Sequence, residues 1–81
     1  MALKSTTIVL AGDYNEYTSY VKEFPPQERR GFIFANTVYD VKVGASGKNA
    51  NGIVIGSFRE RPDADIVYAA AKEHCKDILE S

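Results

Sequence analysis

The chain has 81 residues, a length that allows one domain with a single core. Ten basic and eleven acidic residues leave a formal net charge of −1, which excludes the broad positive field of a protein that binds nucleic acid by bulk electrostatics. Hydrophobic residues make up 44% of the chain and charged residues 26%, as in an ordinary folded domain. We therefore expect residues 1–81 to form one globular domain.

Cysteine and histidine are scarce, and long apolar runs are missing. The one cysteine, Cys75, excludes an intrachain disulfide framework and every multi-cysteine zinc pattern, and the one histidine, His74, adds only a single soft ligand. No apolar run reaches the roughly 20 residues of a membrane span or forms a signal-peptide core. These features predict a cytoplasmic protein without a metal, a cofactor or a membrane segment.

Three short apolar runs predict the strands of a sheet. Val and Ile together number thirteen against three Leu, and β-branched side chains favour pleated sheets. The runs are almost continuous, without the alternation of a half-exposed strand, so both of their faces are expected to be covered, as in a parallel sheet. They occupy residues 7–11, 32–35 and 53–58.

The segment after the first run predicts a helix. Asp13 can cap the first helical amides, and Glu16 follows three residues later, as in a capping box. Pro25 and Pro26 end the helix, because the first ring forces the preceding residue out of the helical region. The apolar stripe contains Tyr17, Tyr20, Val21 and Phe24, and the water-facing side contains Glu16, Ser19, Lys22 and Glu23.

The last segment predicts a second main helix. Pro62 suits its first turn, Asp63 and Asp65 complement the positive end of the helix dipole, and residues 69–71 are consecutive alanines with high helix propensity. Its buried side is expected to contain Ile66 or Val67, Ala70, Ala71, Cys75, Ile78 and Leu79. We therefore interpret Cys75 as a small core residue and not as a nucleophile.

Residues 36–47 admit two interpretations. Asn36 is a good helix N-cap, and a parallel connection between the second and third strands needs a crossover of about a dozen residues, which favours a short helix. The β-branched residues within 37–43 favour instead a strand at 38–43, antiparallel to residues 32–35, in an α+β arrangement. We choose the short helix, followed by a turn-rich loop at 44–52.

The order strand, helix, strand, short helix, strand, helix predicts the fold class. With right-handed crossovers, it makes a small three-layer α/β domain of the Rossmann-like or flavodoxin-like kind. The expected sheet has three mainly parallel strands in the order 2-1-3, with two main helices and one short helix.

The carboxyl ends of these strands predict the binding site. In an open parallel sheet the ligand crevice lies beyond those ends, and two helix N-termini also point there. A bland alternative is that Asp13 and Asp63 only cap helices while the arginines are solvated. The candidate binding residues are Asp13, Tyr14, Asn36, Ser57, Arg59, Arg61 and Asp63.

Arg59 and Arg61 stand two residues apart at the end of the third run. On an extended backbone both would project to the same side and could fork a carboxylate or phosphate, or anchor a protein interface. Glu60 and Asp63 could equally neutralise them in a local ion-pair network.

Catalytic motifs are missing. Residues 44–49 resemble a P-loop only superficially, because Asn49 replaces the required hydroxyl and a strand follows instead of a helix. Gly12 has no second or third glycine at dinucleotide-binding spacing, and the adjacent His74 and Cys75 diverge around a helix. The sequence thus predicts no catalytic residues and favours a binding protein over an enzyme.

Two stretches carry a resemblance to a known group. They are residues 7–12 with the Tyr-rich helix after them, and residues 54–63 leading into the final helix. They resemble small bacteriophage-encoded proteins with a presumed Rossmann-like fold and mostly no assigned function. This resemblance implies an accessory protein in the host bacterial cytoplasm that binds a host protein or a defence component.

Leu10, Ala11 and Gly12 are also similar to the end of the first strand in nucleoside deoxyribosyltransferases. The helix after Asp63 has no glutamate at the place of the catalytic residue in that family. This likeness implies, as an alternative function, the binding of a nucleotide or nucleotide-derived signal without catalysis.

The outer edges of a small open sheet are unpaired, and pairing between two chains would enlarge a thin core. A homodimer is therefore a further expectation.

Overall fold

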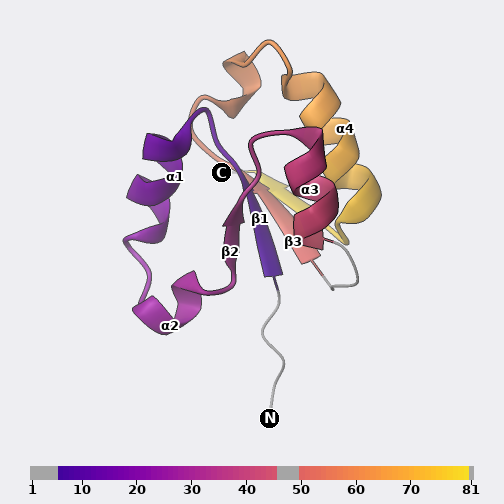
Figure 1. Cartoon of the computed structure of the whole chain (residues 1–81). Helices are drawn as coiled ribbons and strands as arrows, with labels where there is room; N and C mark the ends of the chain where they lie inside the picture. The colour runs from indigo at the N-terminus through magenta and orange to yellow at the C-terminus, as the bar shows by residue number, and fades with distance from the viewer. Residues whose placement is uncertain (1–5, 46–49, 81) are drawn as a thin grey trace.

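The computed structural model describes residues 6–45 and 50–80, in which strands and helices alternate (Figure 1). The elements, in chain order, are β1 (Thr6–Leu10), α1 (Tyr14–Val21), α2 (Pro26–Arg29), β2 (Phe32–Phe34), α3 (Val38–Ala45), β3 (Ala50–Val54), the 3-10 helix η1 (Phe58–Glu60), α4 (Ala64–His74) and β4 (Ile78–Glu80). Within these residues, no helix has the length and apolar character needed to cross a membrane. The α/β class predicted from the sequence is confirmed.

All four strands are parallel, in the order β2-β1-β3-β4. The predicted arrangement with the first strand between the second and the third is confirmed, and a fourth strand extends the sheet beyond β3. One row of paired residues crosses the whole sheet on one face: Phe34, Val9, Ile53 and Leu79. The carboxyl ends of the strands therefore meet at one edge of the sheet, as the sequence predicts.

The fourth strand corrects the prediction that the final helix continues through Ile78 and Leu79. α4 ends at His74, because Cys75 adopts an extended conformation with φ −104° and ψ 148°. The Lys76 N–H then donates to the Ala50 carbonyl at 2.8 Å, and the Gly52 N–H donates to the Asp77 carbonyl at 2.7 Å. Pairing with β3 thus captures three residues that helical spacing alone had assigned to the helix.

The third strand lies nearer the N-terminus than the sequence predicts. It spans Ala50–Val54 and not residues 53–58, so the first residues of β3 had been assigned to a loop. The strand gives way to Gly56, whose φ of +57° favours glycine, and then to η1. Small residues suit the early part of the strand, since a Cβ on Gly52 would lie 3.2 Å from Ile78 Cγ1. The predicted loop residues 46–49 lie outside the described part of the chain.

The short helix predicted within residues 36–47 is confirmed as α3, and the antiparallel strand is wrong. Its first turn is capped by Thr37 and not by Asn36. The Asp40 N–H donates to the Thr37 hydroxyl at 3.2 Å, and Asp40 Oδ2 accepts from the Thr37 and Asn36 N–H groups at 3.1 Å each. This reciprocal cap is the capping box, with aspartate in the place of glutamate.

The first helix begins as predicted, with Asp13 Oδ1 accepting from the Glu16 N–H at 2.9 Å. It ends at Val21 and not at Phe24. The Arg29 side chain from α2 donates to the Val21 carbonyl at 3.0 Å and to the Lys22 carbonyl at 2.6 Å. These bonds satisfy carbonyl groups that a helix C-terminus leaves without partners.

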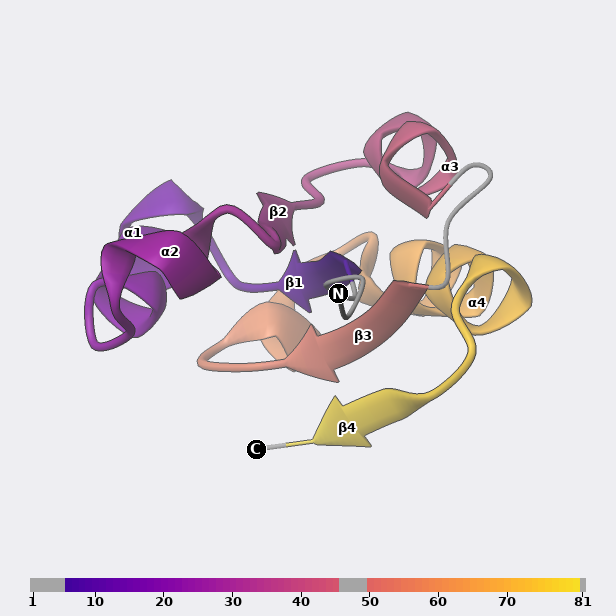
Figure 2. The same ribbon diagram turned by 90° about the horizontal axis from the view of Figure 1, so that it is seen from below.

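Helices cover the two faces of the sheet unequally. α3 and α4 pack on one face, where the larger cluster includes Ile8, Leu10, Val41, Val54, Phe58, Val67 and Cys75. On the other face, rings from α1 and β2 surround the buried Val9, Ala11 and Ile55. Figure 2 shows α1 and α2 beside β2 and β1, and among the described residues no α-helix covers that face of β3 and β4. The expected three layers therefore exist over only half of the sheet.

Cys75 is buried in the larger cluster, and desolvation raises the pKa of its thiol. Its interpretation as a small core residue is confirmed. Of the two alternatives for the buried side of α4, Val67 is buried while Ile66 is 64% exposed.

Phe58 provides a test of this core, because it is the largest fully buried side chain and is only 1% exposed. We expect Phe58→Ala to lower the free energy of unfolding by about 3–5 kcal/mol, through lost burial and the cavity left behind. Tyr39→Ala, at a 72% exposed position, should change it by less than about 0.5 kcal/mol. Urea unfolding followed by circular dichroism measures both, and equal effects would contradict this account of the core.

Candidate functional site

Glu16 joins two loops at the carboxyl end of the sheet. Its Oε1 accepts from the Gly12 N–H at 2.7 Å and from the Ser57 N–H at 3.0 Å, and its Oε2 accepts from the Ser57 hydroxyl at 2.9 Å. Gly12 follows β1, and Ser57 follows β3. The carboxylate therefore occupies the place between two neighbouring strands where a parallel sheet offers amide groups to a ligand.

Two glycines make room for this carboxylate. A Cβ on Gly12 would lie 2.2 Å from Ser57 Oγ and 2.6 Å from Glu16 Oε1. A Cβ on Gly56 would lie 2.3 Å from Glu16 Oε1, and its φ of +57° already disfavours any side chain. Both loops are thus shaped around the Glu16 side chain.

Hydrogen bonds lower the pKa of the Glu16 carboxyl from its ordinary value of 4.5, led by those from the Ser57 backbone and hydroxyl, with Gly12 next. Donors that favour the charged form explain the direction of this shift. Glu16 was predicted to face water as the fourth residue of a capping box. It is instead the central acceptor of this end of the fold.

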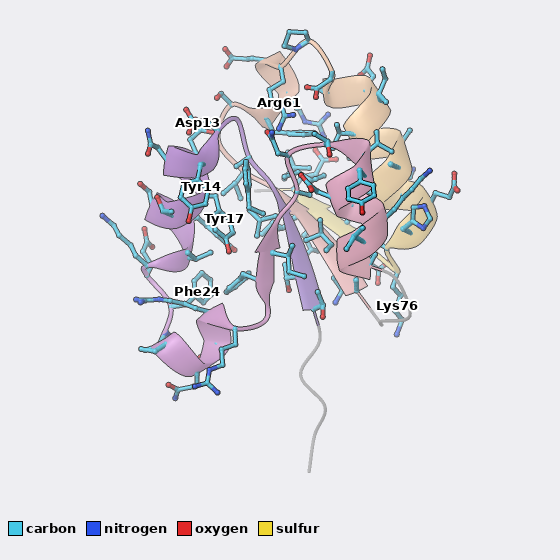
Figure 3. The ribbon with its side chains drawn as sticks, viewed as in Figure 1. Asp13, Tyr14, Tyr17, Phe24, Arg61 and Lys76 are labelled. Atoms are coloured by element: carbon cyan, nitrogen blue, oxygen red, sulfur yellow. The ribbon has the colours of Figure 1, made fainter. Side chains whose placement is uncertain are left out.

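Arg61, which is labelled in Figure 3, makes a second junction at the same edge of the sheet. Its Nη1 donates to the Ala11 carbonyl after β1 at 3.1 Å, and its Nη2 donates to the Asn36 carbonyl after β2. Its Nε and Nη2 also donate to the two carboxylate oxygens of Asp63, at 3.0 and 2.8 Å. The side chain is only 13% exposed, so its donors serve this chain and the guanidinium is held in place.

Asp63 was expected to cap the final helix, but its side chain makes no cap hydrogen bond. The hydrogen bonds from the Arg61 side chain are the main reason that the pKa of the Asp63 carboxyl is lowered from its ordinary value. Asn36 joins the junction through its backbone carbonyl. Arg61 is thus paired with Asp63, one of the two acidic residues that the sequence offered as alternative partners of the arginines.

Arg59 lies in a different environment from Arg61. It forms an ion pair with Glu80 of β4, and its guanidinium carbon stands 5.4 Å from the centre of the Tyr68 ring. The expectation that both arginines project to one side assumed an extended backbone, whereas η1 curls the chain at this point. The two arginines therefore do not form a single fork.

The other predicted binding residues also lie in environments of their own. Ser57 binds Glu16, as described above. Tyr14 is 62% exposed, and its ring packs against Tyr17 and Phe34, each at 5.7 Å between centroids. Asp13 borders an open hollow. The predicted edge is thus one region of the fold, but it contains several separate contacts and not one converging site.

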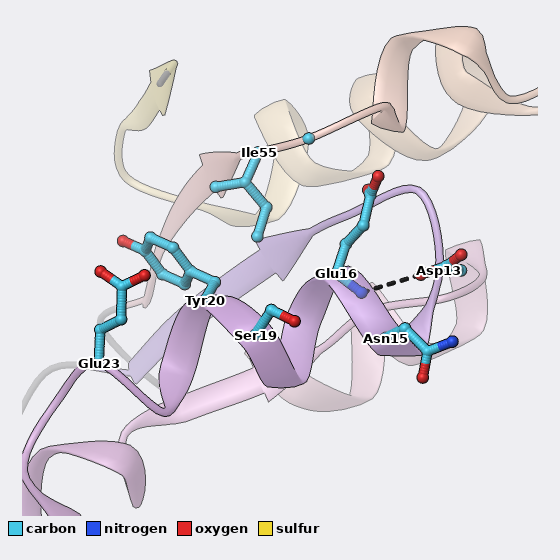
Figure 4. Close-up of a pocket in the computed structure, with 8 residues that line it drawn as sticks. Asp13, Asn15, Glu16, Ser19, Tyr20, Glu23 and Ile55 are labelled. Carbon is cyan, nitrogen blue, oxygen red and sulfur yellow. Dashed lines mark hydrogen bonds between the residues drawn. The ribbon is translucent and has the colours of Figure 1, made fainter.

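The hollow lies between α1 and the end of β3, and its volume is 460 Å³ (Figure 4). This lies within the roughly 300–1,000 Å³ of typical ligand pockets. Asn15 and Ser19 lie four residues apart on one face of α1, Glu23 lies in the turn after the helix, and Ile55 lies across from them. The full lining is Asp13, Asn15, Glu16, Ser19, Tyr20, Glu23, Ile55 and Gly56.

Sequence reasoning identified only Asp13 among these lining residues. It assigned Glu16, Ser19 and Glu23 to the water-facing side of the helix. Ser19 and Glu23 are exposed, but Glu16 is bonded to Gly12 and Ser57, and the wall that Ile55 and Gly56 provide was not predicted. The available signal was Gly56, since a glycine inside a predicted strand often marks a close approach of another group.

Among the described residues, no group of three or more His, Cys, Asp or Glu side chains could hold a metal ion. No family model, curated protein or solved structure matches the chain.

The Glu16 junction predicts an acid-sensitive contribution to stability. Because the folded-state pKa lies below the ordinary 4.5, this contribution is complete above about pH 4.5 and is lost as the pH falls through the folded pKa. We therefore expect Glu16→Gln to melt at a lower temperature than the wild type at neutral pH, with the difference shrinking on acidification. Thermal melts at several pH values measure this. Asp63 titrates in both proteins, so its effect cancels in the comparison. A difference in melting temperature that stays constant with pH would refute the assignment.

The Arg61 junction predicts a different pattern. Arg61→Ala removes donors to two strand-end carbonyls and leaves those groups without partners, so we expect the free energy of unfolding to fall by about 1.5–3 kcal/mol. Arg59→Ala, which removes an exposed ion pair, should have little effect. Urea titrations of both variants provide the comparison. A larger loss of unfolding free energy in Arg59→Ala than in Arg61→Ala would contradict the role given to Arg61.

Proposed function

We propose that this protein is a non-enzymatic binding module, which engages a protein partner beside the carboxyl end of its sheet. The hollow next to α1 receives a basic side chain of that partner, either lysine or arginine. The observation that carries this proposal is the lining itself, in which three carboxylates, those of Asp13, Glu16 and Glu23, occur without any basic residue.

The lining groups suit a cation. Asp13 and Glu23 are exposed, at opposite ends of the lined face of α1, and Asn15 and Ser19 between them offer uncharged acceptors. The Tyr20 ring adds an aromatic wall, which attracts a guanidinium or ammonium group through its π-face. Ile55 supplies an apolar surface for the aliphatic stem of a long basic side chain.

The alternative function, binding of a nucleotide or nucleotide-derived signal, has less support. Arg61 donates to Asp63 and to two backbone carbonyls, and Arg59 pairs with Glu80. The amides of Gly12 and Ser57, which could face a phosphate, already donate to Glu16. A phosphate would have to displace these partners and enter a hollow lined with carboxylates.

A bacteriophage origin, a bacterial host partner and a cytoplasmic location remain predictions from the sequence. They are compatible with the proposal, since it specifies only that the partner presents a basic side chain to the hollow.

The experiment is an NMR titration of the ¹⁵N-labelled protein with two probes, a short alanine peptide that contains one arginine, and adenosine monophosphate. We expect the peptide to shift the amide signals of Asn15, Ser19 and Gly56, and the nucleotide to leave them in place. Asp13→Asn combined with Glu23→Gln should weaken peptide binding up to about fivefold, because the ion pair that the single arginine makes with one of these two carboxylates, worth up to about 1 kcal/mol, is lost whichever of them it uses. Asparagine is as good an N-cap as aspartate, so the helix is preserved.

The matched control is Glu28→Gln combined with Glu73→Gln, which removes the same charge from exposed positions outside the hollow. Peptide binding by this control should equal that of the wild type. Equal weakening in both double variants would reduce the effect to net charge and refute the site. Shifts with the nucleotide and none with the peptide would refute the proposal in favour of the alternative.

A further inference from the structure

The two outer edges of the sheet differ. At the β2 edge, α1 lies alongside the strand, and the Tyr17 hydroxyl donates to the Phe32 carbonyl at 3.3 Å. This carbonyl points away from β1, because the carbonyl of the preceding residue, Gly31, accepts from the Thr7 N–H of β1. One outward acceptor of the β2 edge is thus occupied from within the chain.

The β4 edge has no such cover in the part of the chain that the structure describes. Figure 2 shows β4 as the last element on its side of the sheet. The Asp77 carbonyl accepts from Gly52 of β3, so the alternation along a strand directs the N–H and C=O groups of Ile78 and Glu80 outward. Open strand edges of this kind are templates for pairing with another chain.

Beside this edge lies the uncovered face of the sheet. Leu79 is paired with Ile53 in the row of side chains that crosses all four strands. Along this row Val9 is fully buried, Ile53 is half-buried, and Leu79 is 62% exposed. Side-chain exposure therefore increases along the row from Val9 to Leu79, and the row ends in an apolar side chain at the open edge.

We propose that a second copy of this chain occupies the β4 edge, in an antiparallel, two-fold symmetric pairing centred on Leu79. The outward groups of Ile78 then bond with those of Glu80 in the other copy, and those of Glu80 with Ile78. Leu79 faces its own counterpart as a non-hydrogen-bonded pair, the geometry in which opposite side chains are closest. The row continues across the axis into Leu79 and Ile53 of the second copy.

Charge also suits self-pairing. Glu80 is the single charged side chain of β4, and it forms an ion pair with Arg59 and accepts from the Tyr68 hydroxyl at 3.4 Å. In the two-fold register Glu80 stands opposite Ile78, so no like charges oppose one another. One three-residue ladder makes a small interface, and the dimer therefore dissociates on dilution.

The first test is sedimentation equilibrium over a concentration series. The wild type is expected to shift toward twice the monomer mass of 8.9 kDa as its concentration rises. Leu79→Asp should remain monomeric, because it places two like charges face to face. The matched control is Ile66→Asp, at a position of similar exposure on α4, which should associate like the wild type. A wild type that stays monomeric at its highest soluble concentration, or a dimer that survives Leu79→Asp, overturns the proposal.

The register has its own test. Leu79→Cys should form a disulfide-linked dimer under mild oxidation, since the two-fold axis places the new thiols opposite one another. Asp77→Cys, directly before β4 and two residues earlier than Leu79, should not, because its counterpart lies about 13 Å away. Cys75 is buried and present in both variants. Equal cross-linking of the two variants on a non-reducing gel, or none in Leu79→Cys, rejects this register.

Discussion

The carboxylate of Glu16 holds together the end of the sheet at which parallel α/β proteins bind their ligands. It reaches from the first turn of α1 to a loop 41 residues later in the chain and takes up amide groups from two strand ends. The turns at Gly12 and Gly56 are shaped to admit it. A negative group is thus already present at the place where such folds offer their amides to an external anion. The binding surface that we propose therefore lies elsewhere on the same edge.

Arg61 repeats this principle with the opposite charge. Its guanidinium joins the ends of β1 and β2 and holds Asp63, so the less exposed of the two arginines at this edge is also used by the chain itself. What remains exposed is one face of α1, where Asp13 and Glu23 have no basic neighbour in the hollow. A net charge of −1 therefore conceals a local asymmetry, because the basic groups of this edge are paired internally while Asp13 and Glu23 at the hollow are exposed.

Local sequence patterns were sufficient for about half of the fold. β1, β2 and α3 follow from apolar runs and crossover length, and the cap at Asp13 follows from residue type. The limits of β3 and β4 did not follow, because they depend on each other: Gly52 and Ile78 become strand residues only by pairing. The site was harder still. Only half of the predicted capping box forms: Asp13 accepts from the Glu16 N–H, but the Glu16 carboxylate binds Gly12 and Ser57, and Ser57 is distant in sequence. The 3-10 helix η1 invalidated the spacing argument for the two arginines.

One packing arrangement accounts for both surfaces that the fold leaves open. Rings from α1 and the segment after it pack against β2, as in the contacts of Tyr17 with Phe34 and of Phe24 with Phe32, at 5.3 and 4.8 Å between centroids. These contacts hold α1 over β2 and away from β3. Ile55, directly after β3, is left as the far wall of the hollow, and Ile53, two residues earlier and on the same face, is left at the margin of the uncovered sheet. The aromatic cluster that secures one edge of the sheet thereby exposes the other half, and both proposed binding surfaces follow from that displacement of a single helix.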